Sequence, residues 1–224
     1  MTLKEVLGVM PGVTAVIGSG GKTTLLQTLG QELAAEGHRV ILCTTTKIGP
    51  FPGIPNLLEG GEAALSAALR EHRLVCAASP LADSWKLTAP EIPIARLAEL
   101  AEYVIVEADG SARLPLKAHA AHEPVIPAEE SLTVCVTGVS GFGRTIAEAA
   151  HRPDRFAALA ETAPEEPATP ENTALVLGKE ALADIYLFNQ ADTPERWEWA
   201  LRAARALGRP PVLGSLHEGA YRLC

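Results

Sequence analysis

The chain has 224 residues, a formal net charge of −8 and 47% hydrophobic residues. This length and composition suit one α/β domain with a large core, so we expect residues 1–224 to form a single domain. The acidic charge balance argues against a nucleic-acid partner, and the lack of a leader pattern or of an apolar run near about 18 residues leads us to expect a cytoplasmic protein without membrane contact.

Apolar runs and helical patterns alternate along the chain. The runs predict strands over residues 13–17, 40–44, 74–77, 103–108, 132–137, 185–189 and 212–214. Helical spacing predicts helices over residues 23–36, 62–72, 94–102, 145–150, 153–161 and 194–207. Because most runs are continuously apolar, the strands should be buried on both faces of a mostly parallel sheet of about seven strands, with helices on both faces. The ligand site of such a fold lies at the carboxyl ends of its strands.

A glycine-rich turn, G-S-G-G-K-T-T, follows the first predicted strand. Glycine allows positive φ and close approach to a ligand, and the helix N-terminus that follows attracts phosphate. We expect Lys22 to contact the terminal phosphates of a nucleotide and Thr23 to offer its hydroxyl to Mg²⁺. The turn is shorter than G-x-x-x-x-G-K-[ST], since Val16 stands where that motif has its first glycine. The nucleotide-binding residues predicted here are Gly18, Ser19, Gly20, Gly21, Lys22, Thr23 and Thr24.

Polar residues also follow the second and fourth predicted strands. The candidates after the second strand, for a second substrate or a lid, are Thr45, Thr46 and Lys47, although threonine also simply suits strands. The fourth strand ends in E-A-D-G. We predict Asp109 as a Mg²⁺ ligand beside Thr23, and Glu107 as the group that orients or deprotonates the attacking water. With Lys22, these two carboxylates form the predicted catalytic set, and a plain D-G turn is the alternative.

Residues 110–130 form a long polar segment without periodicity, and such segments are usually functional or disordered. Further candidates for a lid or second substrate lie here: Arg113, Lys117 and His122. The spacing of His119, His122 and Glu123 also suggests a metal site. Prolines at positions 115, 124 and 127 prevent a regular helix that would align such ligands, so we expect solvated histidines.

The middle of the chain offers weaker signals. Residues 138–144 resemble a second glycine-rich loop but lack G-K-[ST], and we interpret them as flexible. Residues 140–170 are predicted as a small helical excursion from the sheet, with the P-E-E-P-A-T-P stretch at 164–170 as a linker or exposed loop. Three cysteines within predicted strands, Cys43, Cys76 and Cys135, should be buried free thiols, whereas we expect Cys224 to be mobile.

The sixth predicted strand leads into N-Q-A-D. This element resembles the N-K-x-D sequence with which GTPases read guanine, where the aspartate accepts two hydrogen bonds from the base. We therefore predict that Asp192 reads the base and that Asn189 helps to hold the base and the loop. Gln190 replaces the lysine of that element, which leaves both ATP and GTP open, and Asp192 could instead cap the next helix.

These motifs together resemble the YqeC family over roughly residues 10–215. The residues that carry the resemblance are G-S-G-G-K-T-T, T-T-T-K-I, E-A-D-G-S-A-R-L-P-L-K, H-E-P-V-I-P, H-R-P and N-Q-A-D. The family is P-loop NTPase-like, and its members are described as accessory factors of selenium-dependent molybdenum hydroxylases. The resemblance implies a three-layer P-loop NTPase-like fold and a role in maturing or inserting a selenium-containing molybdenum cofactor. It implies a molybdenum hydroxylase or a cofactor-maturation protein as partner.

Three functions compete at this point. The leading hypothesis is a Mg²⁺-dependent NTPase that uses ATP or GTP. The second is an ATP-dependent kinase or ligase that activates a small substrate, because the compact loop also resembles that of Mur-type ligases. The third is a carrier that holds a nucleotide or cofactor without chemistry. Lys22 and Thr23 argue against the carrier, since an inert holder has less need of a metal-binding hydroxyl.

Overall fold

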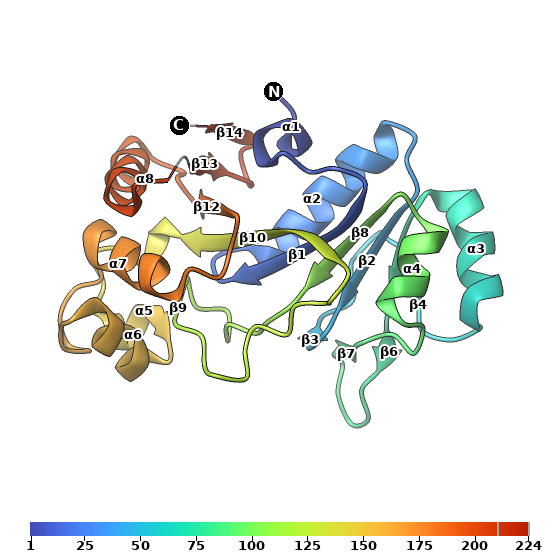
Figure 1. Cartoon of the computed structure of the whole chain (residues 1–224), viewed down its shortest axis with the longest axis horizontal. Coiled ribbons are helices and arrows are strands. Elements are labelled where there is room, and N and C mark those ends of the chain that lie inside the picture. The colour runs from blue at the N-terminus through green and yellow to red at the C-terminus, as the bar shows by residue number, and fades with distance from the viewer. Residues whose placement is uncertain (210, 224) are drawn as a thin grey trace.

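The computed structural model describes residues 1–209 and 211–223, so Cys224 lies outside the described residues. A nine-stranded sheet runs through it in the order β14-β13-β12-β10-β1-β8-β2-β5-β4 (Figure 1). All its neighbouring strands pair in parallel except β13 and β14, which are antiparallel. Its strands are β1 (Gly12–Gly18), β2 (Val40–Thr44), β4 (Asn56–Leu57), β5 (Leu74–Ala77), β8 (Tyr103–Glu107), β10 (Glu130–Gly138), β12 (Ile185–Asn189), β13 (Val212–Ser215) and β14 (Ala220–Leu223).

The seven predicted strands are confirmed, and the sheet is extended at its edges by β4 and β14. The helices are α1 (Leu3–Leu7), α2 (Lys22–Ala35), α3 (Gly61–His72), α4 (Ile94–Leu100), α5 (Ile146–Ala149), α6 (Pro153–Ala160), α7 (Pro170–Glu180) and α8 (Pro194–Leu207), with a 3-10 turn η1 (Val139–Gly141). No described helix has both the length and the apolar composition that crossing a bilayer requires.

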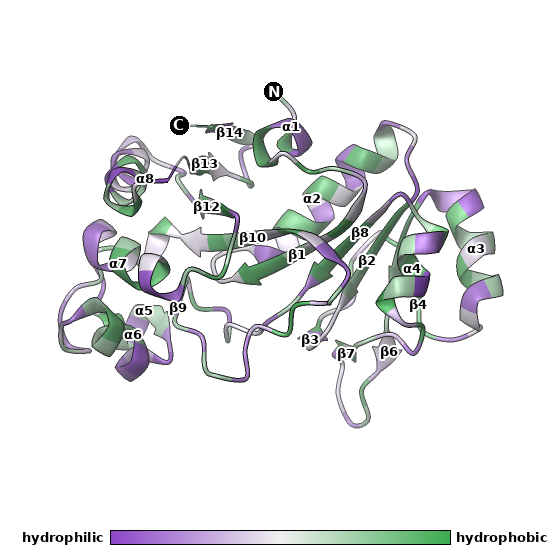
Figure 2. Cartoon of the chain, in the orientation of Figure 1, coloured by the Kyte–Doolittle hydropathy of each residue, from purple (hydrophilic) through white to green (hydrophobic). Residues whose placement is uncertain are grey.

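Helices cover both faces of the sheet, as expected for a three-layer α/β fold. Successive strand residues point to opposite faces. Val16 of β1 packs with α1 and α2 on one face, whereas Val13 packs with α3 and α4, and Ile17 with α6 to α8, on the other. In Figure 2 the central strands carry much of the hydrophobic colour and the helices carry both colours. The buried cysteines Cys43, Cys76 and Cys135 belong to these cores, as predicted.

The region after β10 is more ordered than the sequence suggested. Gly138 donates its N–H to Pro115 O, and η1 follows, so the glycine-rich stretch is held in place rather than loose. The 164–170 stretch is exposed at residues 165–167, but Ala168 exchanges backbone hydrogen bonds with the 143–144 turn and is buried. The stretch is therefore an anchored loop and not a free linker.

Helix α7 is an element that the sequence reading missed. Thr169 caps it, because its hydroxyl accepts a hydrogen bond from Asn172 N while the Asn172 side chain accepts one from Thr169 N. Pro170 occupies the first helical position. The helix packs against α8 and α6 within the same core as β10 and β12.

Two small sheets lie beyond the carboxyl ends of the main strands, below the large sheet in Figure 1. One consists of β3 (Lys47–Ile48), β6 (Ser79–Pro80) and β7 (Leu87–Thr88), and we call these strands with the 81–86 hairpin loop the flap. The other pairs β9 (Leu116–Lys117) with β11 (Ala150–His151). Together they bring the 108–123 segment and the flap to the edge where the predicted site residues converge.

Candidate functional site

The turn between β1 and α2 requires glycine. Gly20 and Gly21 have φ values of 80° and 122°, in the region that side chains rarely adopt. A Cβ at Gly20 would meet the backbone of Gly138, and one at Gly21 would lie 2.5 Å from the Asn189 amide nitrogen. Both the conformation and the space therefore exclude larger residues.

Hydrogen bonds hold this turn from three sides. Gly18 N donates to Asp109 Oδ2 (2.8 Å), and Ser19 Oγ donates to Pro115 O (2.7 Å). Asn189 Nδ2 donates to Gly20 O (2.8 Å), while Asn189 Oδ1 accepts from Leu216 N (2.9 Å). The loop is thus arranged before any ligand arrives, and Asn189 links it to the segment after β12.

A cleft of about 690 Å³ opens over the start of α2, within the size range of small-molecule sites. The first-turn N–H groups of a helix have no intrahelical partner and carry its positive dipole end, so this wall attracts anions. The glycine turn and the start of α2 form this wall of the cleft, with Gly20, Gly21, Lys22, Thr23 and Thr24. The facing walls include Thr46, Lys47, Trp85, Lys86, Glu107, Arg113 and Gln190.

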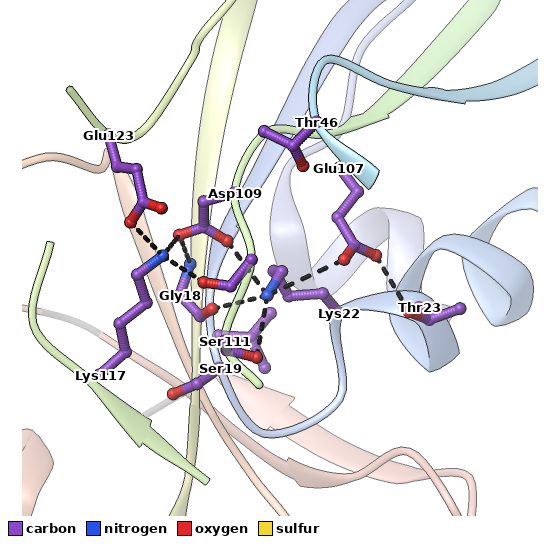
Figure 3. A network of polar contacts seen from close by, with 12 residues as sticks. Gly18, Ser19, Lys22, Thr23, Thr46, Glu107, Asp109, Ser111, Lys117 and Glu123 are labelled. Carbon is purple, nitrogen blue, oxygen red and sulfur yellow. Dashed lines mark hydrogen bonds and ion pairs between the residues drawn. The ribbon is translucent and has the colours of Figure 1, made fainter. Parts of the chain in front are cut away.

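Lys22 lies at the centre of a buried polar network (Figure 3). Its Nζ donates to Gly18 O (2.7 Å) and lies 3.0 Å from Asp109 Oδ1 and 3.9 Å from Glu107 Oε1. Ser111 Oγ, at 3.3 Å, is a further acceptor. The ammonium is therefore fixed beside the glycine turn, at the wall of the cleft.

Glu107 is the carboxylate that contacts Thr23. Thr23 Oγ1 donates to Glu107 Oε2 at 3.0 Å, and the Glu107 carbonyl is held by Thr44 Oγ1 and Thr45 N. Burial raises the pKa of Glu107 above its usual value, against the opposing effect of Lys22. A hydroxyl and a carboxylate oxygen thus lie together at the start of α2.

Asp109 is fully buried beneath the loop. Besides Gly18 N and Lys22, its carboxylate contacts Lys117 Nζ (3.0 Å) and His119 Nε2 (2.8 Å). Burial alone would favour the neutral acid, but these charged partners outweigh it and hold the pKa of Asp109 well below its usual range. Asp109 is therefore an ionised anchor that joins the loop to the following segment.

The histidine prediction is wrong for His119, which is only 3% exposed. Its Nδ1 lies 2.8 Å from Glu180 Oε2, so the ring bridges two carboxylates. Burial lowers its pKa, but the two carboxylates raise it by more. His122 is exposed, as expected. Among the described residues no group of three or more His, Cys, Asp or Glu side chains is arranged to hold a metal ion.

Of the other lid candidates, some line the cleft, whereas Lys117 and Thr45 are held by contacts with other parts of the chain. Thr46, Lys47 and Arg113 line the cleft. Lys117 is buried and pairs with Glu123 (2.8 Å), which Arg152 binds with both terminal nitrogens, so Lys117 braces the segment instead of reaching out as a lid. The Thr45 hydroxyl donates to the backbone carbonyl of Val125.

Asp192 lies outside the residues that line the cleft, near its Gln190 end. Its carboxylate accepts from Ser215 Oγ (2.5 Å) and Arg196 (3.2 Å), and its side chain is partly exposed. Gln190, with φ of 67°, lines the cleft itself.

The sequence analysis did not identify Glu180, the partner of His119, because this residue ends a helix that the sequence pattern did not reveal.

This combination of a mostly parallel sheet, a glycine turn and a buried lysine followed by an exposed threonine at a helix N-terminus defines a P-loop-type α/β protein. The family model described as "YqeC protein" matches residues 14–154. The chain is 35% identical over 162 residues to the YqeC protein of Escherichia coli (strain K12), an alignment that covers 69% of this chain and 63% of that protein. This chain therefore belongs to the YqeC family, as the motifs predicted, and it spans less than two thirds of the length of that relative.

One solved structure with a similar fold is HypB from Helicobacter pylori in complex with nickel. The two chains share 12% sequence identity and a TM-score of 0.42, over 97% of this chain and 82% of HypB.

Proposed function

We propose that this protein binds a nucleoside triphosphate together with Mg²⁺ and hydrolyses its terminal phosphoanhydride bond. The observation that carries the proposal is the meeting of Lys22, Thr23 and Glu107 at the start of α2, inside one cleft. Phosphoryl transfer depends mainly on positioning and on charge stabilisation, which such a site supplies.

The phosphates would lie against the N–H groups of the glycine turn and the first turn of α2. Lys22 Nζ would then exchange its contacts with Gly18 O and Glu107 for phosphate oxygens, while Asp109 keeps the ammonium beside the turn. The exchange keeps the buried ammonium compensated throughout.

Thr23 and Glu107 fit a magnesium ion, since Mg²⁺ prefers hydroxyl, carboxylate and water oxygens and their oxygens lie 3.0 Å apart. The ion would neutralise charge on the phosphates when bound. This division of roles differs from our sequence expectation, which gave the metal to Asp109. Asp109 already contacts Gly18 N, Lys22, Lys117 and His119, and we assign it to holding the loop.

We assign base recognition to Asp192, and Asn189 would help by holding the loop beside the base. The contact from Asn189 to Gly20 O supports this, because it ties the segment after β12 to the phosphate loop. If Asp192 reads guanine, Asp192→Ala will abolish a preference for GTP over ATP in calorimetric titrations. An unchanged ratio of the two dissociation constants would remove Asp192 from this role.

Membership of the YqeC family supports the biological setting that we propose. Hydrolysis would assist the maturation or insertion of the selenium-containing molybdenum cofactor of a hydroxylase, and the partner would be that hydroxylase or a maturation protein. Turnover should rise when the apo-hydroxylase and a selenium donor are both added. Equal turnover with and without the apo-hydroxylase and the selenium donor would contradict the proposed role in cofactor maturation.

Calorimetry of ATP and GTP, each with and without Mg²⁺, tests the central proposal. Lys22→Ala should weaken nucleotide binding by about 10- to 100-fold, because it removes a charge-assisted contact of roughly 1.5–3 kcal/mol. The matched control is Lys4→Ala, on the exposed side of α1. Equal affinity of the Lys22 and Lys4 variants would refute the phosphate role.

A second pair of variants separates the two carboxylates. Glu107→Gln should abolish the Mg²⁺ dependence of nucleotide binding while the chain stays folded. Asp109→Asn should instead lower the free energy of unfolding and leave the Mg²⁺ dependence in place. If Asp109→Asn alone removes the Mg²⁺ dependence and leaves stability intact, the metal belongs to Asp109 and our assignment is wrong.

A further inference from the structure

The flap forms a cationic, aromatic wall of the cleft. Lys47, Trp85 and Lys86 come from the flap, and Arg113 reaches the same wall from the segment after β8. Trp85 is 62% exposed, which is unusual for so large an apolar ring. Its ring packs against Gly49, where a Cβ would lie 2.8 Å from the ring edge, so the absence of a side chain at Gly49 leaves room for the indole.

The cations of this wall lack protein counter-charges. Within residues 1–209 and 211–223, no carboxylate oxygen lies within 4.0 Å of the Lys47, Lys86 or Arg113 side-chain nitrogens, although the protein as a whole carries a charge of −8. The Lys86 ammonium and the Arg113 guanidinium lie 5.9 and 5.8 Å from the Trp85 ring centroid. Positive charge is thus gathered around the exposed Trp85 ring, where it would attract an anion.

The sheet topology places this wall and the end of the cleft that we assign to the nucleotide base on opposite sides of β1. Strand β1, which leads into the glycine turn, lies near the centre of the sheet. The N-Q-A-D segment follows β12 on one side of β1, whereas the flap begins directly after β2 on the other side. A nucleotide whose phosphates lie at α2 and whose base lies toward Gln190 would leave the flap wall free.

We propose that the flap wall binds a second ligand, a planar heterocycle that carries a phosphate or a similar anionic group. The ring would stack on Trp85, and Lys47, Lys86 and Arg113 would neutralise its anion. Stacking on an aromatic side chain and cation contact supply affinity without demanding a particular ring substituent. The inference rests on the proposed function only in taking the nucleotide to occupy the rest of the cleft.

Flavin mononucleotide is a suitable probe, because it is planar, phosphorylated and fluorescent, and riboflavin is its partner without phosphate. We expect saturable quenching of flavin fluorescence by the wild-type protein, with and without Mg²⁺ and a non-hydrolysable nucleotide. Riboflavin should bind at least about fivefold more weakly, because it lacks the phosphate that the cations would neutralise. Flavin mononucleotide should bind to Trp85→Ala at least about fivefold more weakly than to the wild type, since one stacked ring contributes roughly 1–3 kcal/mol. Trp85→Phe should retain most of the affinity because it keeps an aromatic face.

Arg113→Ala should weaken flavin mononucleotide binding, and Arg155→Ala, at an exposed position of α6, is its matched control. Equal binding of riboflavin, an unchanged affinity in Trp85→Ala, or no binding up to about 1 mM would each overturn the proposal. Displacement of the flavin by nucleotide would also overturn it, because the wall would then belong to the nucleotide site. Lys22→Ala distinguishes the two proposals, since it should weaken nucleotide binding by about 10- to 100-fold and leave flavin binding unchanged.

Discussion

Asp109 shows how much of this site depends on one buried carboxylate. Lys22, Lys117 and His119 all pair with it, and Gly18 N donates to it. Removing one partner of a buried ion pair typically costs about 3–5 kcal/mol, because the remaining charge is left uncompensated. The network therefore couples the shape of the phosphate loop to groups as distant in sequence as Glu180 at the end of α7.

His119 makes the stability of this network depend on pH. Its pKa is raised in the folded protein, because the charged ring donates to Asp109 and Glu180. Because the pKa of His119 is higher in the folded than in the unfolded protein, its protonation stabilises the fold. This contribution is fully present below the unfolded pKa of about 6.5 and is lost as the pH rises through the folded pKa. We expect His119→Gln to lower the free energy of unfolding by about 2–4 kcal/mol at pH 6 and by less at pH 9.

Urea denaturation of both proteins at the two pH values measures this difference. His122→Gln, at the exposed neighbouring histidine, should change little at either pH. A cost for His119→Gln that is the same at pH 6 and pH 9 would show that the imidazole charge does not contribute.

The elements differ in how readily their sequence reveals them. The strands are continuous apolar runs that suit burial on both faces, and the structure contains all seven of those predicted. Helix α7 buries only one side chain larger than valine, Leu177, alongside Pro170, Thr173, Ala174 and Val176, so its apolar stripe is weak beside the proline-rich stretch before it. The edge strands β4 and β14 exist because a neighbouring strand offers hydrogen bonds, which no local pattern records.

The cap of α7 provides a test at the scale of one element. Thr169→Ala should lower the free energy of unfolding by about 1 kcal/mol, because Asn172 N loses its acceptor at the start of the helix. Thr193→Ala removes a longer cap hydrogen bond at α8 (3.3 Å) that has no reciprocal partner, and it should cost less. Urea denaturation compares the two variants, and a neutral Thr169→Ala would mean that packing alone sets where α7 begins.

At the scale of the whole molecule, ligand binding should raise the melting temperature. A ligand at 100 times its dissociation constant stabilises the folded state by about 2.7 kcal/mol. For a chain of this size that corresponds to a rise of about 5–10 °C. Scanning calorimetry with Mg²⁺ and a non-hydrolysable nucleotide at one fixed concentration should show this rise for the wild type and about half of it or less for Lys22→Ala, whose affinity is expected to be lower. Equal shifts in both proteins would place the ligand outside the glycine turn.

The sequence by itself determined the α/β class, the strands of the sheet and the glycine turn that presents Lys22 and Thr23, because each depends on neighbours in the chain: apolar runs, glycine conformation and helix spacing. It also identified the family. The tertiary structure alone decided which partners meet. Glu107 rather than Asp109 contacts Thr23, His119 is buried between two carboxylates, and Lys117 braces the loop from beneath. These pairings join residues up to 84 positions apart, and only the packing of the strands brings them within hydrogen-bonding distance.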